Sequence, residues 1–332
     1  MLHNECLEQV NHVLMKRVNT VAMVVYSLVF VLGTIGNGLV IFITGFRMKK
    51  TVHAVWILNL AIADFTFSIF LPFNIVYVGL NFHWPFGRIM CKLIQNIAFF
   101  NLIASIFLLV VISVDRCITV WWPVWTQNCR TPRLASFVAL GVWILAVLFF
   151  SPDLYFTETY YDDETNTTYC LNTYDINEGG ESIHHVMVIA RFIFGFAIPF
   201  SVIVICYGAV AWRIRRDHLS PSSRPFKIIT AVIVAFFVCW FPFHIFSFLI
   251  VKALNECSLH VVAYIGLLLS YSLAHFNSCL NPVLYFCLGH NFKDKMRCSL
   301  LSALVNAFTE ESNQSTTKTK TRSSAELESH SL

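Results

Sequence analysis

The sequence predicts an all-α membrane protein, a bundle of seven transmembrane helices followed by a short amphipathic helix on the membrane surface. Only 13% of the 332 residues are charged and 57% are hydrophobic, whereas a soluble domain averages about 25% charged residues. Seven apolar runs are long enough to cross a bilayer core, which takes about 20 residues as a helix. Positive residues gather in alternate connections between these runs, and this asymmetry orients membrane helices.

The seven runs follow one another with short connections. They cover residues 20–46, 52–80, 88–121, 133–152, 184–212, 226–251 and 259–287. The first run is too long for the apolar region of a cleavable signal peptide, so we expect it to act as a signal anchor. Residues 1–19 are expected to form an extracellular N-terminus and residues 20–290 the bundle.

Two segments follow the bundle. Residues 291–305 are amphipathic but too polar to span, so we expect a helix that lies in contact with membrane lipids. Cys298 ends this segment beside Lys295 and Arg297, which makes it a palmitoylation candidate. Residues 306–332 are rich in Ser, Thr, Lys and Glu and are expected to form a disordered cytoplasmic tail.

The distribution of charge predicts the orientation in the plasma membrane. The connections on one side carry the basic residues Arg47, Lys49, Lys50, Arg130, Arg133, Arg213, Arg215, Arg216, Arg224 and Lys227. This side is expected to be cytoplasmic, which places the N-terminus outside. The sequon at Asn166 then falls in an external loop, as glycosylation requires. A net charge of +4 is too small to suggest nucleic-acid binding.

An acid, Asp64, lies near the middle of the second span, in LNLAIADF. An ionisable residue inside a membrane is by default a candidate functional site. Polar side chains occur at comparable depth on other spans, at Asn37, Asn101, Ser105, Asn277, Ser278 and Asn281. A carboxylate with amide and hydroxyl oxygens could form a cage for a small cation such as sodium. A hydrogen-bonded polar core without an ion is the alternative.

Three spans carry an internal proline: Pro199, Pro242 in CWFPF and Pro282 in NPVLY. Proline removes a backbone hydrogen bond and kinks a helix. Kinks near polar residues suggest hinges of a bundle with two states, and passive packing features are the alternative.

The third span ends in SVDRC, with Asp115 and Arg116 at its cytoplasmic side. With LNLAIADF, CWFPF and NPVLY, this motif resembles the rhodopsin-like G-protein-coupled receptors over roughly residues 20–305. The resemblance implies that Arg116 pairs with Asp115 in the inactive state and contacts a heterotrimeric G protein in the active state. Cys117 departs from the pattern, because most of the family has tyrosine there.

The same resemblance implies roles for further residues. Trp240 and Phe236 would respond to bound ligand, and Tyr207 and Tyr285 would move inward on activation. Asp64 would hold an allosteric sodium ion in the inactive state. The activation motifs are completed by Pro242, Asn281 and Pro282.

Longer stretches, among them HWPFG, PVWTQNCRTPR and HFNSCLNP, resemble the chemoattractant receptors, with the formyl-peptide and chemerin-type receptors as the nearest group. Formyl-peptide receptors carry an acid where this chain has Phe99 and a second arginine where it has Met187. Two of their three polar anchors are therefore absent. Chemerin-type receptors keep a single arginine, here Arg191, and an apolar third span, which fits better.

Arg191 is a permanent cation in the otherwise apolar outer half of the fifth span. A guanidinium binds a carboxylate through two parallel hydrogen bonds, so we expect a peptide C-terminus or a lipid acid to bind there. An internal partner, Asp153 or a loop acid, is the alternative. The side chains expected to line the same pocket are Phe99, Phe100, Phe243, Tyr271 and His275, for which ordinary packing is the plainer interpretation.

Four cysteines are expected on the outer face. By the resemblance, Cys91 and Cys170 form a disulfide, and the oxidising exterior favours it. Cys6 and Cys257 could also pair and tie the N-terminus to the third external loop, although spacing alone does not determine connectivity. The outer stretch YYDDE could be tyrosine-sulfated or simply solvated.

These features predict a G-protein-coupled receptor for an extracellular chemoattractant-type ligand, a peptide or lipid carrying a carboxylate. By the resemblance, its partners are an inhibitory-class G protein, arrestin, and receptor kinases acting on SNQSTTKTKTRSS. The alternative is a decoy receptor that internalises ligand with arrestin but without G-protein signalling, for which Cys117 leaves room. An enzyme is not expected, because no nucleophile, base and oxyanion arrangement occurs. A transporter is not expected either, because no repeat with matched broken spans occurs.

Overall fold

The computed structural model describes residues 12–173, 180–217, 223–252 and 257–288. The predictions about Cys6, Cys298, the surface helix at 291–305 and the tail fall outside these residues. The chain divides into two compact units, Met1–Tyr285 and Phe286–Leu332, and all seven spans begin in the first unit.

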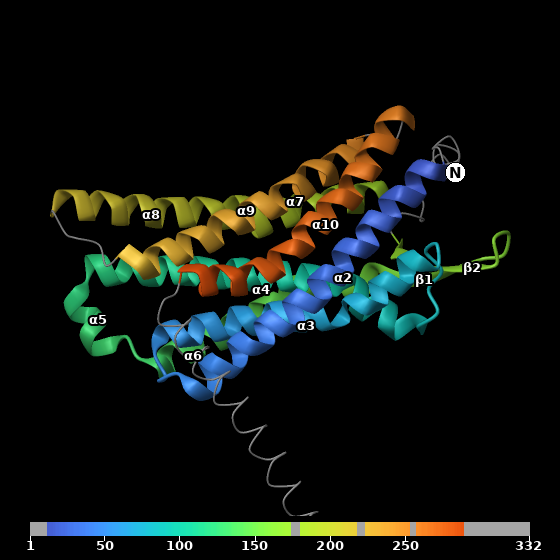
Figure 1. Cartoon of the computed structure of the whole chain (residues 1–332). Coiled ribbons are helices and arrows are strands. Elements are labelled where there is room, and N and C mark those ends of the chain that lie inside the picture. Colours follow the sequence, from blue (N-terminus) through green and yellow to red (C-terminus); the bar gives the residue numbers. More distant parts are fainter. Residues whose placement is uncertain (1–11, 174–179, 218–222, 253–256, 289–332) are drawn as a thin grey trace, which may run out of the picture. The chain divides into compact units, whose positions relative to one another are not determined.

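Seven helices in the described part of the chain are long and apolar enough to cross a membrane, which confirms the predicted seven spans. The first four are α2 (His12–Phe42) with the π-helix η1 (Ile43–Arg47), α3 (Val52–Gly79), α4 (Gly87–Trp121) and α6 (Pro132–Phe156). The last three are α7 (Gly180–Phe192) with η3 (Ile193–Ala197) and α8 (Ile198–Arg216), then α9 (Ser223–Lys252), then α10 (Cys257–Leu288). Figure 1 shows these helices side by side in one bundle.

Polar residues account for the differences between predicted and observed boundaries. The first helix begins at His12 rather than near residue 20, because its polar first turns continue the helix beyond the apolar run. The second and fourth spans begin at threonine caps. Thr51 accepts a hydrogen bond from the Ala54 amide at 3.1 Å, and Thr131 accepts one from the Leu134 amide at 3.2 Å.

The third span, α4, is the centre of the bundle. It packs against α3, α6 and α8, and 67% of its apolar window is buried, against 22–50% for the other spans. Large apolar side chains on the outer helices stay exposed, among them Phe137, Ile144 and Leu148 on α6. An apolar exterior of this kind fits hydrocarbon as the surrounding solvent.

The fifth span is interrupted where it carries its proline. Pro199 is the second residue of α8 and follows directly after the π-helix η3. Proline has no N–H to donate to the carbonyl four residues earlier, that of Gly195, and π-bulges are frequent where the regular ladder is broken in this way. Pro242 and Pro282 lie inside α9 and α10, as predicted.

A β-hairpin, which the all-α prediction missed, covers the end of the bundle where α4 begins. Strands β1 (Thr157–Asp162) and β2 (Thr167–Asn172) pair antiparallel, with Thr159 opposite Cys170. Their threonines and tyrosines favour a strand. Cys170 forms a disulfide with Cys91, which confirms that predicted bond.

The hairpin turn holds the predicted glycosylation site. Asn166 lies in this turn with a φ of 50°, and the Tyr161 hydroxyl donates to its side-chain oxygen at 2.5 Å. The position is exposed, as a glycan requires. We refer to this end of the bundle as the Cys91 end, and to the opposite end of α4 as the Arg116 end.

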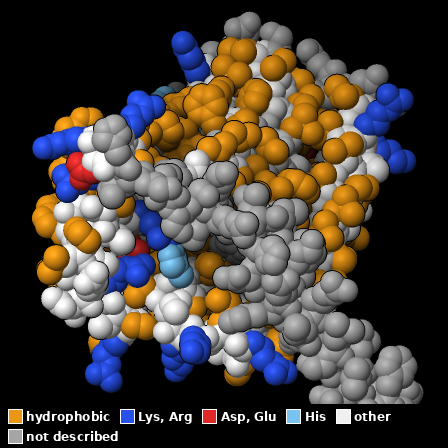
Figure 2. Space-filling view, turned by 60° about the vertical axis from the view of Figure 1, so that its left-hand side comes forward, with side chains coloured by type: hydrophobic (Ala, Val, Ile, Leu, Met, Phe, Trp, Pro, Cys, Tyr) orange, Lys and Arg blue, Asp and Glu red, His pale blue; other side chains and the backbone are white. Residues whose placement is uncertain are grey.

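Basic side chains surround the Arg116 end. Figure 2 views the first unit from the side of this end, where Lys and Arg side chains lie around the rim and apolar side chains cover much of the flank. A short helix that was not predicted, α5 (Pro123–Cys129), connects the third and fourth spans here.

Candidate functional site

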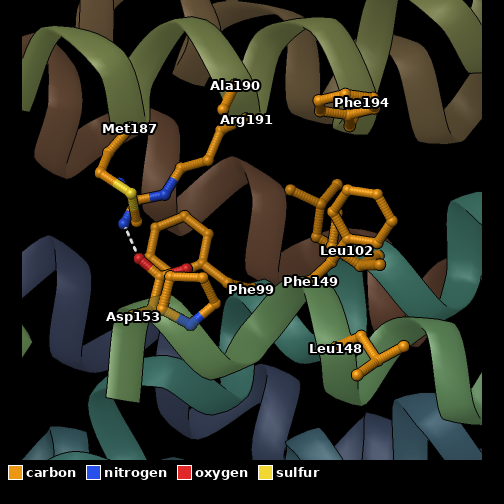
Figure 3. Close-up of a pocket in the computed structure, with 11 residues that line it drawn as sticks. Phe99, Leu102, Leu148, Phe149, Asp153, Met187, Ala190, Arg191 and Phe194 are labelled. Atoms are coloured by element: carbon orange, nitrogen blue, oxygen red, sulfur yellow. Dashed lines mark hydrogen bonds and ion pairs between the residues drawn. The ribbon is translucent and has the colours of Figure 1, made fainter. Parts of the chain in front are cut away.

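A buried ion pair joins the fourth and fifth spans at the Cys91 end. Arg191 lies in the last turn of α7, and its guanidinium binds the carboxylate of Asp153 on α6 (Figure 3). The two side chains are only 15% and 5% exposed. The internal partner considered for Arg191 is therefore present, and each ion compensates the charge of the other in a poorly solvated site.

The guanidinium of Arg191 also lies over an aromatic ring. Its central carbon is 4.2 Å from the ring centroid of Phe99, within the range of a cation–π interaction. Phe99 occupies the position at which formyl-peptide receptors carry an acid. The cation is thus held by one carboxylate and one ring face.

A cavity of about 320 Å³ opens beside the ion pair. Figure 3 shows side chains of α4, α6, α7 and η3 around it. Apart from Asp153 and Arg191 its walls are apolar, formed by Phe99, Leu102, Ile103, Leu148, Phe149, Pro152, Met187, Ala190 and Phe194. A pocket with a few polar groups in apolar walls is typical of small-ligand sites. Most of these apolar walls were not predicted, because they depend on how the spans are rotated.

Aromatic contacts lead from the ion pair into the bundle. Phe99 lies 5.8 Å from Phe243 and 6.4 Å from Tyr271, measured between ring centroids. Phe243 lies 5.8 Å from Trp240, which lies 6.1 Å from Phe236. The predicted pocket residues Phe99, Phe243 and Tyr271 therefore come together and contact the predicted activation residues on α9.

Two residues predicted for this pocket lie elsewhere. Phe100 lies on another face of α4, 5.7 Å from Trp143, because consecutive helical residues point about 100° apart. His275 is buried 4.8 Å from both Tyr26 and Phe67, so it lies against the first and second spans. Neither side chain is among those that line the cavity.

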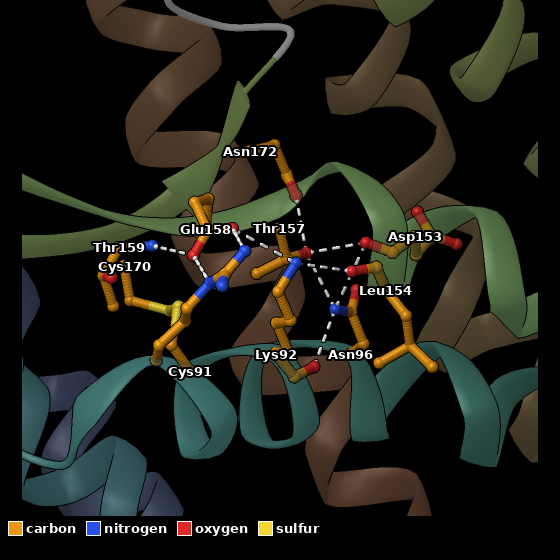
Figure 4. Close-up of polar contacts among 11 residues, drawn as sticks. Cys91, Lys92, Asn96, Asp153, Leu154, Thr157, Glu158, Thr159, Cys170 and Asn172 are labelled. Carbon is orange, nitrogen blue, oxygen red and sulfur yellow. Dashed lines mark hydrogen bonds and ion pairs between the residues drawn. A yellow bond between two sulfur atoms is a disulfide. The ribbon is translucent and has the colours of Figure 1, made fainter.

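A polar network fixes the hairpin over this site (Figure 4). Arg88 donates to both carboxylate oxygens of Glu158, at 2.6 and 2.7 Å. These bonds lower the pKa of Glu158 to about 2. Asn96 donates to the Thr157 hydroxyl at 2.7 Å, and this hydroxyl donates to the Asp153 carbonyl at 2.9 Å. The network therefore holds the end of α6 from which the Asp153 side chain reaches Arg191.

A second polar cluster lies in the middle of the bundle around Asp64, which is fully buried. Its carboxylate accepts from the side-chain nitrogen of Asn281 at 2.7 Å and from that of Asn101 at 3.5 Å. Asn101 also donates to the Ser278 hydroxyl at 3.1 Å and accepts from the Ser105 hydroxyl at 3.3 Å. The structure thus joins four of the five predicted sodium ligands through direct hydrogen bonds.

The donor atoms of this cluster fit a small hard cation. Two buried amide oxygens, those of Asn277 and Asn281, have no hydrogen-bond donor among the described residues. A buried carboxylate surrounded by amide and hydroxyl oxygens is a suitable donor set for such an ion. Asp64 would supply the negative charge, and Asn277 and Asn281 would offer neutral oxygens.

The first and seventh spans approach closely beside this cluster. A Cβ atom placed on Gly36 would lie 3.0 Å from two side-chain atoms of Pro282, so only glycine fits there without displacing α10. Asn37 donates to the Ser278 carbonyl at 2.8 Å. These contacts fix the depth at which α10 presents its polar residues to Asp64.

At the Arg116 end, Asp115 has a partner that differs from the expected one. Its carboxylate forms two hydrogen bonds with Arg130, at 2.7 and 2.8 Å, rather than an ion pair with Arg116. Arg116 instead contacts the imidazole of His53 on α3. The expectation of an Asp115–Arg116 pair is therefore wrong for this conformation, because Arg130, just beyond α5, binds the carboxylate with both arms of its guanidinium.

The remaining activation residues lie on the last three spans. Tyr207 on α8 forms a hydrogen bond with Thr230 on α9. Phe236 and Trp240 are almost fully buried. The backbone of Tyr285 lies in α10, but its side chain is outside the described atoms, as is that of Cys257. The inward movement of Tyr285 and the Cys6–Cys257 bond stay predictions.

Comparisons with known proteins agree with this architecture. The family described as 7 transmembrane receptor (rhodopsin family) matches residues 36–285. Chemerin-like receptor 1 of Rattus norvegicus is 42% identical over 308 residues, covering 88% of this chain and 82% of the relative. N-formyl peptide receptor 3 of Pongo pygmaeus is 41% identical over 301 residues, covering 87% and 86%. The matched family is one of multi-pass membrane receptors and not of enzymes. The chain therefore belongs to the rhodopsin family of seven-transmembrane receptors, on its chemoattractant-receptor branch.

Proposed function

We propose that this receptor binds an extracellular ligand through a carboxylate that replaces Asp153 as the partner of Arg191. The observation that carries the proposal is the position of the Arg191–Asp153 pair in the wall of an otherwise apolar cavity. An exchange of one carboxylate for another keeps the buried guanidinium paired throughout. The ligand therefore avoids the large cost of leaving that cation without a partner.

The apolar walls favour a ligand with a hydrophobic group next to its carboxylate. A volume of about 320 Å³ accommodates a large apolar side chain or part of an acyl chain, but not a folded domain. The names of the relatives point to peptide ligands. Phe99 and Met187 replace the polar anchors of formyl-peptide receptors, so we favour the C-terminus of a chemerin-type peptide over a formylated N-terminus.

The released carboxylate of Asp153 has a cation close to its own backbone. Lys92 donates to the carbonyl of Leu154, the next residue, at 3.0 Å. The side chain of Lys92 also lies 3.4 Å from the Glu158 carboxylate. Asp153 would therefore move toward positive charge when the ligand takes its place, which lowers the cost of the exchange.

The aromatic contacts give a route from ligand to activation. Displacing Asp153 alters the position of Arg191 over Phe99, and Phe99 packs against Phe243. Phe243 and Trp240 lie on α9, on either side of Pro242. A change in their packing would bend α9 at this proline and open a G-protein site around Arg116. Bistable packing of this kind converts small shifts into helix movement.

Orientation and ion binding complete the proposal. The basic rim of the Arg116 end faces the cytoplasm, by the positive-inside rule. The G protein, of the inhibitory class, binds there, and arrestin and receptor kinases act on the same side. At the Cys91 end, the Asn166 turn then lies outside the cell, where it can carry a glycan.

A sodium ion at Asp64 would stabilise the inactive bundle. It would offset the buried carboxylate that otherwise depends on hydrogen bonds from Asn101 and Asn281. We expect sodium chloride to weaken agonist binding to the parent and to have no such effect on Asp64→Asn. Matched choline chloride controls for ionic strength. A sodium effect that persists unchanged in Asp64→Asn would remove the ion from this site.

The experiment that tests the function records G-protein dissociation and arrestin recruitment in cells. The probes are chemerin-like C-terminal peptides, other chemoattractant peptides and long-chain fatty acids, each as the free acid and as the neutral amide. An active acid with a much weaker amide supports carboxylate binding. Arrestin recruitment without dissociation of any G protein would instead support the decoy alternative.

A further inference from the structure

Two thiols on different spans lie in contact at the Arg116 end. Cys117 on α4 and Cys206 on α8 are joined by a side-chain hydrogen bond. Both are free cysteines. Cys117 is partly exposed, whereas Cys206 is 9% exposed. The proposed mechanism uses neither of them.

The environment of the pair favours its oxidation over that of other thiols. A sensor cysteine needs some access and a second thiol that can resolve its oxidised form. Cys117 provides the access and Cys206 the second thiol. Cys129 on α5 is exposed, and Cys239 and Cys279 are buried.

We propose that Cys117 and Cys206 are a redox modification site whose substrate is a peroxide, and that oxidation forms a disulfide that links α4 to α8. The Cys117 thiolate attacks one peroxide oxygen, which yields a sulfenic acid and releases the other oxygen as water. The Cys206 thiolate then attacks the sulfenic sulfur, the new S–S bond forms, and the hydroxyl leaves as a second water. The two thiols lose two electrons and two protons, and the peroxide gains them.

The positions of the two cysteines give the bond a consequence for signalling. Cys117 follows Arg116 directly, and Cys206 precedes Tyr207, which is hydrogen-bonded to Thr230 on α9. A covalent link would hold the Arg116 and Tyr207 segments at their present separation. The activation proposed above requires these segments to move, so the disulfide should reduce signalling. This consequence rests on the proposed function, whereas the bond itself does not.

The bond can be detected by peptide mapping of the full-length receptor. Trypsin cleavage after Arg116 and Arg130 releases residues 117–130, which contain both Cys117 and Cys129. Cleavage after Arg191 and Arg213 releases residues 192–213, whose one cysteine is Cys206. The assay therefore uses a Cys129→Ser background, so that a cross-link between these two peptides identifies one pair of thiols.

Cells expressing this receptor are treated with hydrogen peroxide, and remaining thiols are alkylated before digestion. We expect the cross-linked peptide at the summed mass less two hydrogen atoms, and its loss when Cys206→Ser is added. Alkylation of both Cys117 and Cys206 after peroxide would overturn the proposal. Oxidation of Cys117 alone, without a cross-link, would overturn it as well.

A signalling measurement separates this proposal from the proposed function. Peroxide should lower agonist-driven G-protein dissociation at least twofold in the Cys129→Ser receptor and leave it unchanged when Cys206→Ser is added. If the cross-link forms and signalling is unaffected, the modification site stands but its control of activation is wrong. If no agonist is found, peptide mapping still tests the bond.

Discussion

The substitution Asp153→Ala tests whether the buried ion pair holds the fourth and fifth spans together. It removes the carboxylate but leaves Arg191 in place, with a side chain that is only 15% exposed. The guanidinium then keeps its contact with the Phe99 ring. The variant therefore isolates the cost of one buried cation that has lost its carboxylate.

The expected loss of stability follows from that geometry. Removing one member of a buried pair costs about 3–5 kcal/mol, because the other charge stays uncompensated. The cation–π contact with Phe99 offsets part of this, by about 0.5–2 kcal/mol. We therefore expect a loss near the lower end, about 3 kcal/mol. The double variant Asp153→Ala with Arg191→Met removes both charges and should lie within about 1 kcal/mol of the parent.

Thermal unfolding of purified receptor in detergent measures the difference. A change of 1 kcal/mol shifts the Tm of a large domain by about 2 °C or more. Asp153→Ala should therefore lower the Tm by about 6 °C, and the double variant by no more than about 2 °C. Equal losses in the two variants would refute the reasoning, because they would show that local packing of α6, and not the uncompensated cation, accounts for the effect.

Two further predictions concern glycine packing and pH. Gly36→Ala should lower the Tm by up to about 4 °C, because overpacking costs about 1–3 kcal/mol against Pro282 and exceeds the gain of about 1 kcal/mol in helix propensity. Gly141→Ala, with open space around its Cβ, is the matched control and should not lower it; a similar fall in both variants would contradict the packing argument. Glu158→Gln should lower the Tm slightly at pH 7, because Arg88 holds the pKa of Glu158 at about 2, below its usual value near 4.5. A depressed carboxylate pKa stabilises the fold above pH 4.5, and this contribution is lost as the pH falls toward 2. The Tm difference from the parent should therefore shrink below pH 4.5, and a constant difference from pH 7 to pH 3 would exclude this linkage.

The spans were predictable because a membrane imposes length and composition on each one separately. Every helix must satisfy its own backbone and present an apolar exterior, so the seven runs can be counted without knowledge of their packing. The Asp64 cluster was predictable for a related reason, since a charge at mid-membrane needs polar neighbours at the same depth.

Side-chain partners were less predictable because they depend on the rotation and contacts of each span. Phe99 and Phe100 are consecutive, yet one packs against Phe243 and the other against Trp143. The partner of Asp115 is Arg130, which approaches only because α5 returns the chain to the end of α4. Neither outcome leaves a periodic signal in the sequence.

The hairpin was missed because external loops carry no requirement for regular structure. Its strands are held by the Cys91–Cys170 disulfide and by Arg88, 70 residues away from Glu158 in the chain. The bond itself could be expected from the resemblance. The register that places Thr157 under Asn96 could not.

The measurement that tests the central claim most directly is a comparison of potency between a free-acid probe and its amide. The probe is the most potent carboxylate peptide or fatty acid from the panel, assayed by G-protein dissociation on the parent and on Arg191→Ala, with surface expression matched. Loss of one partner of a buried charge pair costs about 2–5 kcal/mol, and each 1.4 kcal/mol is tenfold. The account predicts that the acid exceeds the amide by at least about 30-fold on the parent and that the two are nearly equal on Arg191→Ala. Equal potency of acid and amide on the parent would contradict it.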